Sequence, residues 1–565
     1  MARTVGIGIQ SFEKLIEGNY FYIDKTSFIK EWWESGDDVT LITRPRRFGK
    51  TLNMNMVESF FSVKYADRGD LFEGLSIWQE ERYRKLQGTY PVISLSFSLV
   101  KDTTYESARN KICMILADLY EDHRYLLNGD FLGDTDREYF RRINVNMDDV
   151  DAVMALHKLS KYLYAYYGKK VIILLDEYDT PMQEAYVDGY WDELAAFIRS
   201  LFNATFKTNP YLERGIMTGI TRVSKESIFS DLNNLEVITM TSCKYAASFG
   251  FTEEEVFTAL EEYSLGEKKA GVKQWYDGFV FGEYRDIYNP WSILNFLKKQ
   301  IYDTYWANTS SNSLVKKLLQ GGNSLVKTSL ETLLKGGSIY CQIDEQIVYN
   351  RLKDNEASVW SLLVASGYLK VLSYEQMENM ETARRPRYEL AITNQEVKRM
   401  FFSMIEEWFD EAESDYNNFV KALLLDDLDA MNEYMNQVTL NLFSSFDVGR
   451  RPSGRTEPER FYHGFVLGLM VELADKYKIT SNRESGFGRY DIMLEPLADH
   501  LDAMIMEFKV FNARKEKNLE ETLRNALQQI EDKKYAAELI SRGVPSECIR
   551  KYGFAFEGKK VLIGS

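Results

Sequence analysis

Gly49, Lys50 and Thr51 have the residue types and the order of a site that binds a nucleoside triphosphate. In such a site the lysine ammonium reaches the β- and γ-phosphates, and the threonine hydroxyl contacts Mg²⁺. Backbone N–H groups at the start of a following helix add a dipole that favours the anion. The full pattern begins with another glycine, and Arg44 occupies that position. Because the motif is degenerate, a surface turn with a helix-capping threonine and solvated arginines stays open as an alternative.

Two acids, Asp176 and Glu177, directly follow the aliphatic run Val171–Leu175. An uninterrupted aliphatic run predicts a central strand of a parallel sheet, which is covered on both faces. Ligands of such sheets bind at the carboxyl ends of the strands. Asp176 would then share Mg²⁺ with Thr51, and Glu177 would orient or deprotonate an attacking water. Solvated acids at a strand end are the alternative, but their combination with Lys50 and Thr51 favours a nucleotide site.

Arg222 stands at the end of another predicted strand, 214–222. From the carboxyl edge of the same sheet an arginine can reach a γ-phosphate and act as a sensor or finger. An ordinary surface arginine would have the same sequence context, so both interpretations stay open.

Asp491, Glu507 and Lys509 form a second group of residues that could do chemistry. They lie on two predicted strands of an antiparallel hairpin, and a turn centred on Asp499 would place the two acids opposite each other. Because facing carboxylates repel, they favour a divalent cation, and their oxygen ligands select Mg²⁺ or Mn²⁺. Such an ion can generate hydroxide and stabilise a pentacovalent phosphate, while the lysine positions water or neutralises charge. A cross-strand ladder of acids and lysine on the surface is the alternative.

The bulk properties limit the classes of protein to which the chain can belong. Its 565 residues exceed what one hydrophobic core supports, and 45% hydrophobic with 27% charged residues is usual for globular proteins. The net charge of −16 excludes a generic nucleic-acid binder, so any nucleic-acid contact must use a local patch. Four widely separated cysteines and four histidines argue against a structural zinc site or a histidine-based centre. No apolar signal region or membrane-length apolar run is present, so we expect a cytoplasmic protein that does not contact a membrane.

Three regions are expected to position these residues. Residues 1–250 alternate strands with helices and include the strand Val39–Thr43 directly before the Gly-Lys-Thr motif. Residues 251–444 carry mostly helical patterns, and 445–565 form a further α/β unit after a linker rich in glycine, proline and arginine. The helical patterns of the middle region cover 253–263, 290–299, 357–371, 395–409 and 417–438.

With both groups of residues identified, the chain resembles a family of prokaryotic proteins with an N-terminal AAA-ATPase-like domain and a C-terminal PD-(D/E)XK nuclease-superfamily domain. The stretches that carry the resemblance are Tyr22–Thr26, Arg44–Thr51, Leu174–Asp179, Trp275–Phe279, Ser481–Leu494, Glu507–Lys509, Gln529-Ile530 and Lys533–Tyr535. Arg44 in place of the first glycine is usual in this family. The resemblance implies an α/β fold class, with an AAA-like P-loop NTPase domain on a parallel sheet, a helical middle region and a restriction-endonuclease-like α/β domain.

Together with the patterns above, the resemblance implies roles for individual residues. The residues expected to contact the nucleotide are Arg46, Arg47, Phe48, Gly49, Lys50, Thr51, Asp176 and Arg222. Thr51 and Asp176 would hold Mg²⁺, and Glu177 would be catalytic. In the C-terminal domain the resemblance implies metal ligands at Asp491, Glu507 and Glu459, a catalytic lysine at Lys509 and an assisting side chain at Gln529.

The leading hypothesis is an ATP-hydrolysing protein coupled to a Mg²⁺-dependent nuclease-like domain that acts on DNA, with ATP and Mg²⁺ as cofactors and Mn²⁺ as a further candidate. The alternative is a regulatory NTPase switch, in which an inactive nuclease-like domain binds nucleic acid or protein. A purely structural protein would require both groups of acids to be accidental. Homo-oligomer formation is open by analogy with AAA-like NTPases, because no interface can be identified in the sequence.

Overall fold

The chain forms two compact units in the computed structural model, and each unit is described by itself. Unit 1 comprises Met1–Leu318 and Ser338–Lys398, and unit 2 comprises Leu319–Gly337 and Arg399–Ser565. The structure describes residues 2–223, 228–229, 232–309, 313–320, 324–344, 356–374, 387–410, 416–442, 466–467, 469–473, 476–481, 484–485, 488–489, 491–498, 501–558 and 560–565.

Unit 1 is built on a five-stranded parallel sheet with the strand order β2-β3-β4-β1-β5, as the sequence predicts for this region. Its strands are β1 (Val39–Thr43), β2 (Val92–Ser96), β3 (Val171–Asp176), β4 (Leu212–Gly219) and β5 (Leu235–Ile238). All residues of β1 and β3 are buried, which explains their unbroken apolar and β-branched sequences. Only β4 separates these two strands, so their carboxyl ends lie at the same edge of the sheet.

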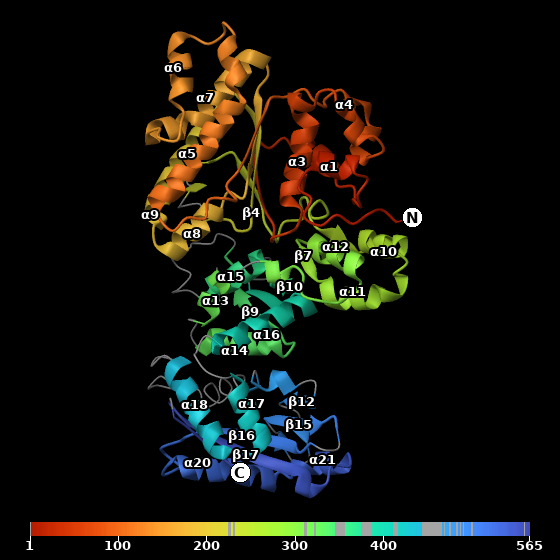
Figure 1. Cartoon of the computed structure of the whole chain (residues 1–565), viewed down its shortest axis with the longest axis vertical. Coiled ribbons are helices and arrows are strands. Elements are labelled where there is room, and N and C mark those ends of the chain that lie inside the picture. The colour runs from red at the N-terminus through yellow and green to blue at the C-terminus, as the bar shows by residue number, and fades with distance from the viewer. Residues whose placement is uncertain are drawn as a thin grey trace, which may run out of the picture. The chain divides into compact units, whose positions relative to one another are not determined.

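Helices cover both faces of this sheet (Figure 1). One face packs against α1, α2 and α3 in a core that includes Trp32 and Phe60, whereas α5, α7 and α9 lie on the other side. The helices of this part are α1 (Phe12–Glu17), α2 (Ser27–Ser35), α3 (Lys50–Phe61), α4 (Glu81–Arg84), α5 (Tyr105–Asp122), α6 (Asp134–Arg142), α7 (Asp149–Tyr167), α8 (Thr180–Asp188) and α9 (Trp191–Phe202).

A helical module follows the parallel sheet and packs around a small antiparallel sheet with the order β6-β8-β7. Its elements are β6 (Phe251–Thr252), α10 (Glu253–Glu262), α11 (Lys269–Tyr276), β7 (Phe279–Phe281), β8 (Tyr284–Tyr288) and α12 (Pro290–Lys299). Tyr276 and Tyr288 are fully buried in its core, where Val5 and Phe21 from the start of the chain also pack. The module is therefore fixed to the N-terminal segment.

A second antiparallel sheet, β10-β11-β9, completes the middle region. The elements of this region in unit 1 are β9 (Ile339–Gln342), α15 (Glu356–Ala365), β10 (Leu369–Tyr374) and β11 (Arg387–Ile392). Two helices, α13 (Ser313–Gln320) and α16 (Gln395–Asp410), are divided between the two units, and α14 (Ser324–Leu334) belongs to unit 2. The helix predicted over 357–371 is therefore too long. Gly367 has φ +81°, a left-handed conformation that ends α15 and starts β10.

Glu396 is a fully buried acid at the start of α16, and its ionisation should make the stability of unit 1 depend on pH. Its carboxylate accepts hydrogen bonds from Ser292 Oγ at 2.8 Å, Trp306 N at 2.5 Å and Ala307 N at 3.3 Å. Burial nevertheless raises the pKa of Glu396 to about 7. Because the native state holds this proton more tightly than the unfolded state, wild-type stability should fall as the pH rises from about 4.5 to about 7.

The substitution Glu396→Gln should remove this pH dependence while keeping a side chain that accepts the same backbone hydrogen bonds. We expect the variant to be more stable than wild type at pH 8 by about 3 kcal/mol, with the difference vanishing near pH 4.5. Urea unfolding at several pH values measures it. A difference that does not change with pH would contradict the assigned pKa.

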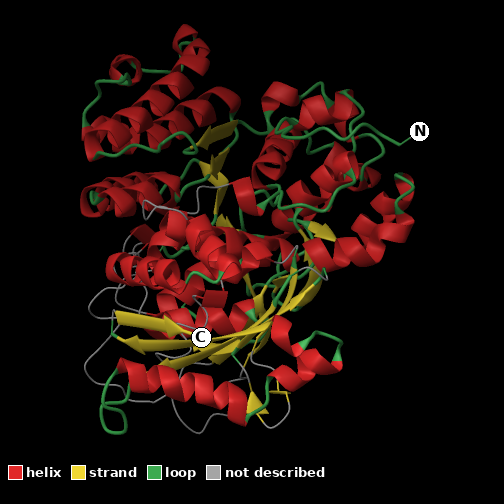
Figure 2. Cartoon of the chain, turned by 60° about the horizontal axis from the view of Figure 1, so that its bottom comes forward, coloured by secondary structure: helices red, strands yellow, loops and turns green. Residues whose placement is uncertain are grey.

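Unit 2 is built on a mixed five-stranded sheet with the order β12-β15-β16-β17-β18, in which only β16 and β17 run parallel (Figure 2). Its elements are α17 (Tyr416–Leu425), α18 (Leu428–Leu442), β12 (Tyr477–Ser481), β13 (Glu484–Ser485), β14 (Gly488–Arg489), β15 (Ile492–Pro496), β16 (Ala503–Val510), α20 (Leu519–Asp532), α21 (Ala536–Ser541), β17 (Ile549–Glu557) and β18 (Lys560–Gly564). The single helix predicted over 417–438 is broken at Asp426, which has φ +58°. Met506 and Phe508 face the larger core, which includes α17 and α18, whereas Ile505 faces a core with Ile530 of α20.

Among the residues that the structure describes, no helix combines the length and the apolar character needed to cross a bilayer. Among the described residues, Cys113, Cys243, Cys341 and Cys548 form no disulfide bond.

Candidate functional site

The Gly-Lys-Thr motif and the two acids of β3 meet at the carboxyl edge of the parallel sheet. Thr51 Oγ1 donates a hydrogen bond to Asp176 Oδ2 at 2.7 Å, although 125 positions separate the two residues. Thr218 at the end of β4 donates to the other carboxylate oxygen. Asp176 is therefore held between β4 and the loop of residues 44–51, called the phosphate loop after its motif, with only 6% of its surface exposed.

Lys50 starts α3 and points its ammonium back into the loop. Nζ donates to the carbonyl oxygens of Arg44 and Pro45, both at 2.9 Å. Burial lowers the pKa of Lys50, and the charges of Asp176 and Glu177 oppose that shift. These acids therefore lie close enough to act on the ammonium. Gly49 caps α3 with φ +81° and offers no side chain as a cap, so the first N–H groups of the helix are available to an anion.

Glu177 lies in the left-handed region of backbone space, with φ +52°. Residues other than glycine rarely adopt this conformation, and those that do are often found at functional sites. Its Oε2 accepts a hydrogen bond from Thr180 Oγ1 at 3.2 Å, and Asp176 Oδ1 accepts one from the Glu177 N–H at 3.0 Å. The chain thus turns directly after β3, and this turn places Glu177 beside Asp176.

Arg44, which replaces the first glycine of the motif, is fully buried. Its guanidinium donates to the carbonyl oxygens of Thr43 at 2.9 Å and Thr239 at 2.6 Å, and it lies 4.4 Å from the ring centroid of Phe281. Burial lowers the pKa of Arg44 to about 9, which leaves the side chain charged at neutral pH. Arg44 thus joins the ends of β1 and β5 to the helical module, and its side chain is directed away from any ligand in the loop.

The rest of the loop divides into exposed cations and a buried anchor. Phe48 is 1% exposed and its ring packs against Phe279 at 4.8 Å and Phe281 at 5.5 Å, so its side chain cannot reach a nucleotide. Arg46 and Arg47 are exposed. The Arg47 guanidinium lies 4.3 Å above the ring of Trp291, and Asn289 donates to the Arg46 carbonyl at 3.3 Å.

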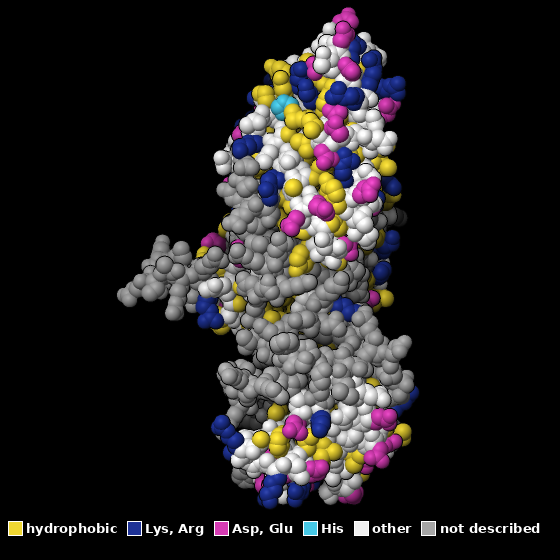
Figure 3. Space-filling model, turned by 90° about the vertical axis from the view of Figure 1, so that its left-hand side faces the viewer, with side chains coloured by type: hydrophobic (Ala, Val, Ile, Leu, Met, Phe, Trp, Pro, Cys, Tyr) yellow, Lys and Arg dark blue, Asp and Glu magenta, His cyan; other side chains and the backbone are white. Residues whose placement is uncertain are grey.

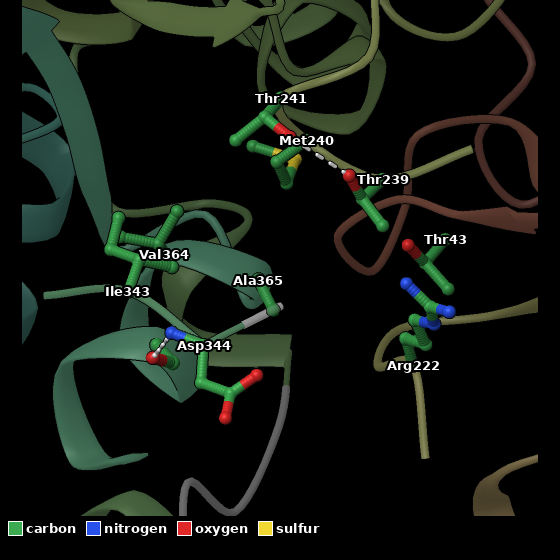
Figure 4. Close-up of a pocket in the computed structure, with 10 residues that line it drawn as sticks. Thr43, Arg222, Thr239, Met240, Thr241, Ile343, Asp344, Val364 and Ala365 are labelled. Carbon is green, nitrogen blue, oxygen red and sulfur yellow. Dashed lines mark hydrogen bonds between the residues drawn. The ribbon is translucent and has the colours of Figure 1, made fainter. Parts of the chain in front are cut away.

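Arg222 follows β4 and lines a small hollow beside the phosphate loop. Figure 4 shows its guanidinium pointing toward Thr43, the last residue of β1. The hollow is lined by Thr43, Arg222, Thr239, Met240, Thr241, Ile343, Asp344, Ser361, Val364 and Ala365. Residues of the middle region therefore close this side of the sheet edge.

The acids of the predicted C-terminal hairpin also come together. Ile492 pairs with Met506 and Leu494 with Met504, which is the predicted register. The same register carried one residue further places Asp491 opposite Glu507. Asp491 Oδ2 accepts a hydrogen bond from the Phe508 N–H at 2.8 Å, directly beside Glu507.

Two further side chains reach Glu507, which is only 2% exposed. Lys509 Nζ lies 3.7 Å from Glu507 Oε1, and Gln529 of α20 donates a hydrogen bond to the same oxygen. Gln529 Nε2 also lies 3.2 Å from Tyr535 Oη. Burial raises the pKa of Tyr535, as do the charges of Glu507 and Asp491, which places both carboxylates near this hydroxyl. Glu459 lies outside the described residues.

The comparisons with known proteins agree with this geometry. Residues 6–229 match the family model described as predicted AAA-ATPase, and residues 457–565 match the PD-(D/E)XK nuclease superfamily. Two family models thus match different parts of the chain, an AAA-ATPase-like one in the N-terminal part and a nuclease-superfamily one in the C-terminal part. The resemblance identified from the sequence is thereby confirmed. A protein of Azotobacter chroococcum mcd 1, described as "Uncharacterized protein in vnfD 5'region", is 27% identical over 562 residues, which cover 96% of this chain and 95% of that protein.

The donor atoms of both domains fit a hard divalent cation. In the AAA-ATPase-like domain the Thr51 hydroxyl and the Asp176 carboxylate already lie within 2.7 Å of each other. In the nuclease-superfamily domain the donors are the carboxylates of Asp491 and Glu507. Oxygen ligands of this kind suit Mg²⁺ or Mn²⁺.

A third acidic group does not belong to either site. Glu253, Asp277 and Asp286 bring carboxylate oxygens within 4.8 Å of one another. Lys273 Nζ lies 3.5 Å from Asp286 and 3.8 Å from Asp277, and it also pairs with Glu253. Burial and the hydrogen bond with Asp286 raise the pKa of Asp277 to about 7. This group is an ion-pair cluster of the helical module, in which Lys273 and Asp286 are exposed.

Sequence patterns missed the residues that hold the AAA-ATPase-like site together. Thr218 donates a hydrogen bond to Asp176. Tyr178 and Asp179 both form hydrogen bonds with Thr221, in the segment that follows β4. The position of Thr218 could have indicated its role, because it is a polar residue at the carboxyl end of a buried strand, and ligands of parallel sheets bind at that end.

Proposed function

We propose that the chain is an ATP-hydrolysing protein whose C-terminal domain is a Mg²⁺-dependent nuclease acting on DNA. Two observations support it: a hydrogen bond joins Thr51 to Asp176, 125 positions away in the sequence, and the strand register places Asp491 opposite Glu507. The proposal divides the chain into an ATPase domain (1–250), a helical middle region (251–444) and a nuclease domain (445–565).

At the ATPase site the side chains of the chain bind and orient the triphosphate. Lys50 and the exposed Arg46 provide positive charge for the phosphates, and Thr51 with Asp176 would hold Mg²⁺, which neutralises charge on the transferring phosphate. Glu177 orients the attacking water and accepts its proton. Gly49 leaves the first N–H groups of α3 free to donate to the phosphate oxygens.

At the nuclease site Asp491 and Glu507 would hold the cation, which lowers the pKa of a bound water. Lys509 stabilises negative charge on the scissile phosphate or positions the water. Gln529 orients the Glu507 carboxylate by its hydrogen bond to Oε1. The buried hydroxyl of Tyr535 in turn fixes Gln529.

A basic loop beside this site is suited to the phosphate backbone of DNA. In the loop 511–518, Glu516 turns inward and accepts hydrogen bonds from Asn512 N at 2.9 Å, Thr522 Oγ1 at 2.8 Å and Asn525 Nδ2 at 2.8 Å. Burial would raise the pKa of Glu516, but these bonds and the charge of Lys509 lower it. The loop therefore exposes the cations Arg514, Lys515 and Lys517 close to Lys509.

This local patch contrasts with the surface of the N-terminal helices. On the face that carries α5 to α9, Lys and Arg side chains are interspersed with Asp and Glu (Figure 3). Mixed charge of this kind does not build a field that attracts a polyanion. The described part of the nuclease domain thus offers the better candidate surface for DNA.

Replacing Arg514 and Lys515 with glutamine should weaken DNA binding and reduce its salt dependence. Each lost phosphate contact lowers the slope of log K against log salt by about 1. Fluorescence anisotropy at several salt concentrations measures this slope, in a Glu507→Gln background that prevents cleavage. The double substitution Lys421→Gln/Lys476→Gln removes the same charge from exposed positions elsewhere in unit 2 and should leave the slope unchanged. Equal slopes for both double variants would contradict a role for the loop.

The proposal as a whole is tested by measuring phosphate release from ATP and cleavage of end-labelled DNA in one preparation of the intact chain. We expect both activities with Mg²⁺ and neither with EDTA. ATP hydrolysis without cleavage of any DNA would support an NTPase switch with an inactive nuclease-like domain.

A further inference from the structure

Tyr178 and Asp179 directly follow the two acids of β3, and their side chains face the segment after β4. Both are buried, Tyr178 fully and Asp179 with 1% exposure. They lie at the start of the turn into α8, next to Glu177. Nothing in the proposed hydrolysis uses them directly, so their burial requires a separate explanation.

One carboxylate oxygen of Asp179 holds the backbone of this segment. Oδ2 accepts hydrogen bonds from Ile220 N at 3.0 Å and from Thr221 N and Thr221 Oγ1, both at 2.8 Å. Gln183 Nε2 donates to the same oxygen at 3.0 Å. A charged acceptor with several neutral donors forms stronger hydrogen bonds than a neutral acceptor does.

Tyr178 holds the same segment from the other side. Its hydroxyl donates to the Thr221 carbonyl at 2.7 Å and accepts from the Val223 N–H at 3.0 Å. Gly219 makes the close approach possible, because a Cβ there would lie 2.6 Å from both Asp179 Oδ1 and a ring carbon of Tyr178. The segment from Gly219 to Val223 is thus fixed to the turn that carries Glu177.

Arg222 lies within this fixed segment, between the two residues that Tyr178 contacts. Its guanidinium points toward Thr43 at the base of the phosphate loop (Figure 4). An arginine side chain has many rotamers, so its charge can occupy a defined position only if the backbone that carries the side chain is itself held in place. The contacts of Tyr178 and Asp179 supply that backbone.

We propose that Tyr178 and Asp179 are positioning residues that hold Arg222 at the sheet edge, where its charge acts on the γ-phosphate of ATP. This inference rests on the proposed ATPase function. It divides the sequence Asp176–Asp179 into two parts with different tasks. The first two acids serve the cation and the water, and the next two residues join the turn after β3 to the segment after β4 that carries Arg222.

A double-mutant cycle on ATP hydrolysis tests this coupling. We expect Arg222→Ala to lower kcat by about 10- to 100-fold, with little change in KM because the phosphate loop is intact. Asp179→Asn keeps one oxygen acceptor but removes its negative charge, which weakens the hydrogen bonds from Ile220 and Thr221, and it should lower kcat by up to that factor. If Asp179 acts through Arg222, Asp179→Asn should have no further effect in the Arg222→Ala background.

If the Asp179→Asn variant does not fold, Tyr178→Phe can replace it in the double-mutant cycle. It removes one buried hydroxyl and should lower kcat less than Asp179→Asn does, again only when Arg222 is present. The matched control is Tyr120→Phe, because the Tyr120 hydroxyl also donates to a buried carbonyl, that of Ala155 at 2.8 Å. We expect this control to lower thermal stability but not kcat.

The outcomes separate this inference from the proposed function. A wild-type chain that hydrolyses no ATP contradicts the proposed function and this inference with it. If the wild type hydrolyses ATP but Arg222→Ala does not lower kcat, only the positioning role is overturned. The same holds if the losses of kcat caused by the two single substitutions multiply in the double variant. An equal fall of kcat in Tyr178→Phe and Tyr120→Phe would also overturn it.

Discussion

Replacing Glu177 with glutamine should lower kcat for ATP hydrolysis by about 10²- to 10⁴-fold while ATP still binds. Glutamine has the shape of glutamate, but it cannot accept a proton from the attacking water. The contacts of Lys50 and Thr51 with the loop and with Asp176 do not involve the Glu177 side chain, so the phosphate site should stay formed. Phosphate release measures hydrolysis, and equilibrium dialysis with labelled ATP measures binding.

The control for this prediction is Glu184→Gln on α8, a partly exposed glutamate of the same domain that has no place in the proposed site. It should hydrolyse ATP at the wild-type rate. If Glu177→Gln keeps wild-type hydrolysis, the assignment of Glu177 as the catalytic base is wrong. If it loses binding as well as hydrolysis, Glu177 instead supports the structure of the loop.

The second large effect is expected at the nuclease site. Glu507→Gln should lower Mg²⁺-dependent strand cleavage by at least about 100-fold, because one of two carboxylate ligands is lost. Glu507 is buried beside Asp491, Lys509 and Gln529, and an isosteric amide there leaves no cavity. ATP hydrolysis should be unchanged in this variant, so the two activities report on the two domains separately.

The matched control is Glu531→Gln, two residues after Gln529 on α20. Glu531 pairs with Lys551 at 2.6 Å on the exposed side of the helix, and its loss should leave cleavage intact. Cleavage that persists in Glu507→Gln would exclude the proposed metal site. A loss of cleavage in both variants would indicate a general defect of α20.

The parts of the fold that the sequence predicts are those with a clear period or an unbroken apolar run. β1 and β3 are buried along their whole length, so their composition alone identifies central strands and the edge where ligands bind. The C-terminal hairpin has a side-chain period of two and a short connection, which fix its register and place Asp491 opposite Glu507. Local rules suffice in both cases.

Long-range contacts explain what the sequence does not predict. Phe48 belongs to the phosphate loop, yet its ring is buried against β7, more than 200 residues away, so its side chain anchors the loop. Arg44 is buried for a similar reason, because its partners are carbonyl oxygens on β1 and at the end of β5. The short strands β6 to β11 were not predicted, because the sequence around them has mostly the spacing of apolar residues that is typical of helices. None of these pairings leaves a periodic signal in one sequence.

The central claim is that acids from separate strands meet around a divalent cation at two independent sites. A titration of the intact chain with Mn²⁺, read from the electron paramagnetic resonance signal of free Mn²⁺, tests it most directly. Without nucleotide, Glu507→Gln should bind about one equivalent less than wild type. With a non-hydrolysable ATP analogue, wild type should gain about one equivalent that Thr51→Ala does not. Mn²⁺ binding that is unaffected by Glu507→Gln, or that does not respond to the nucleotide, would contradict the claim.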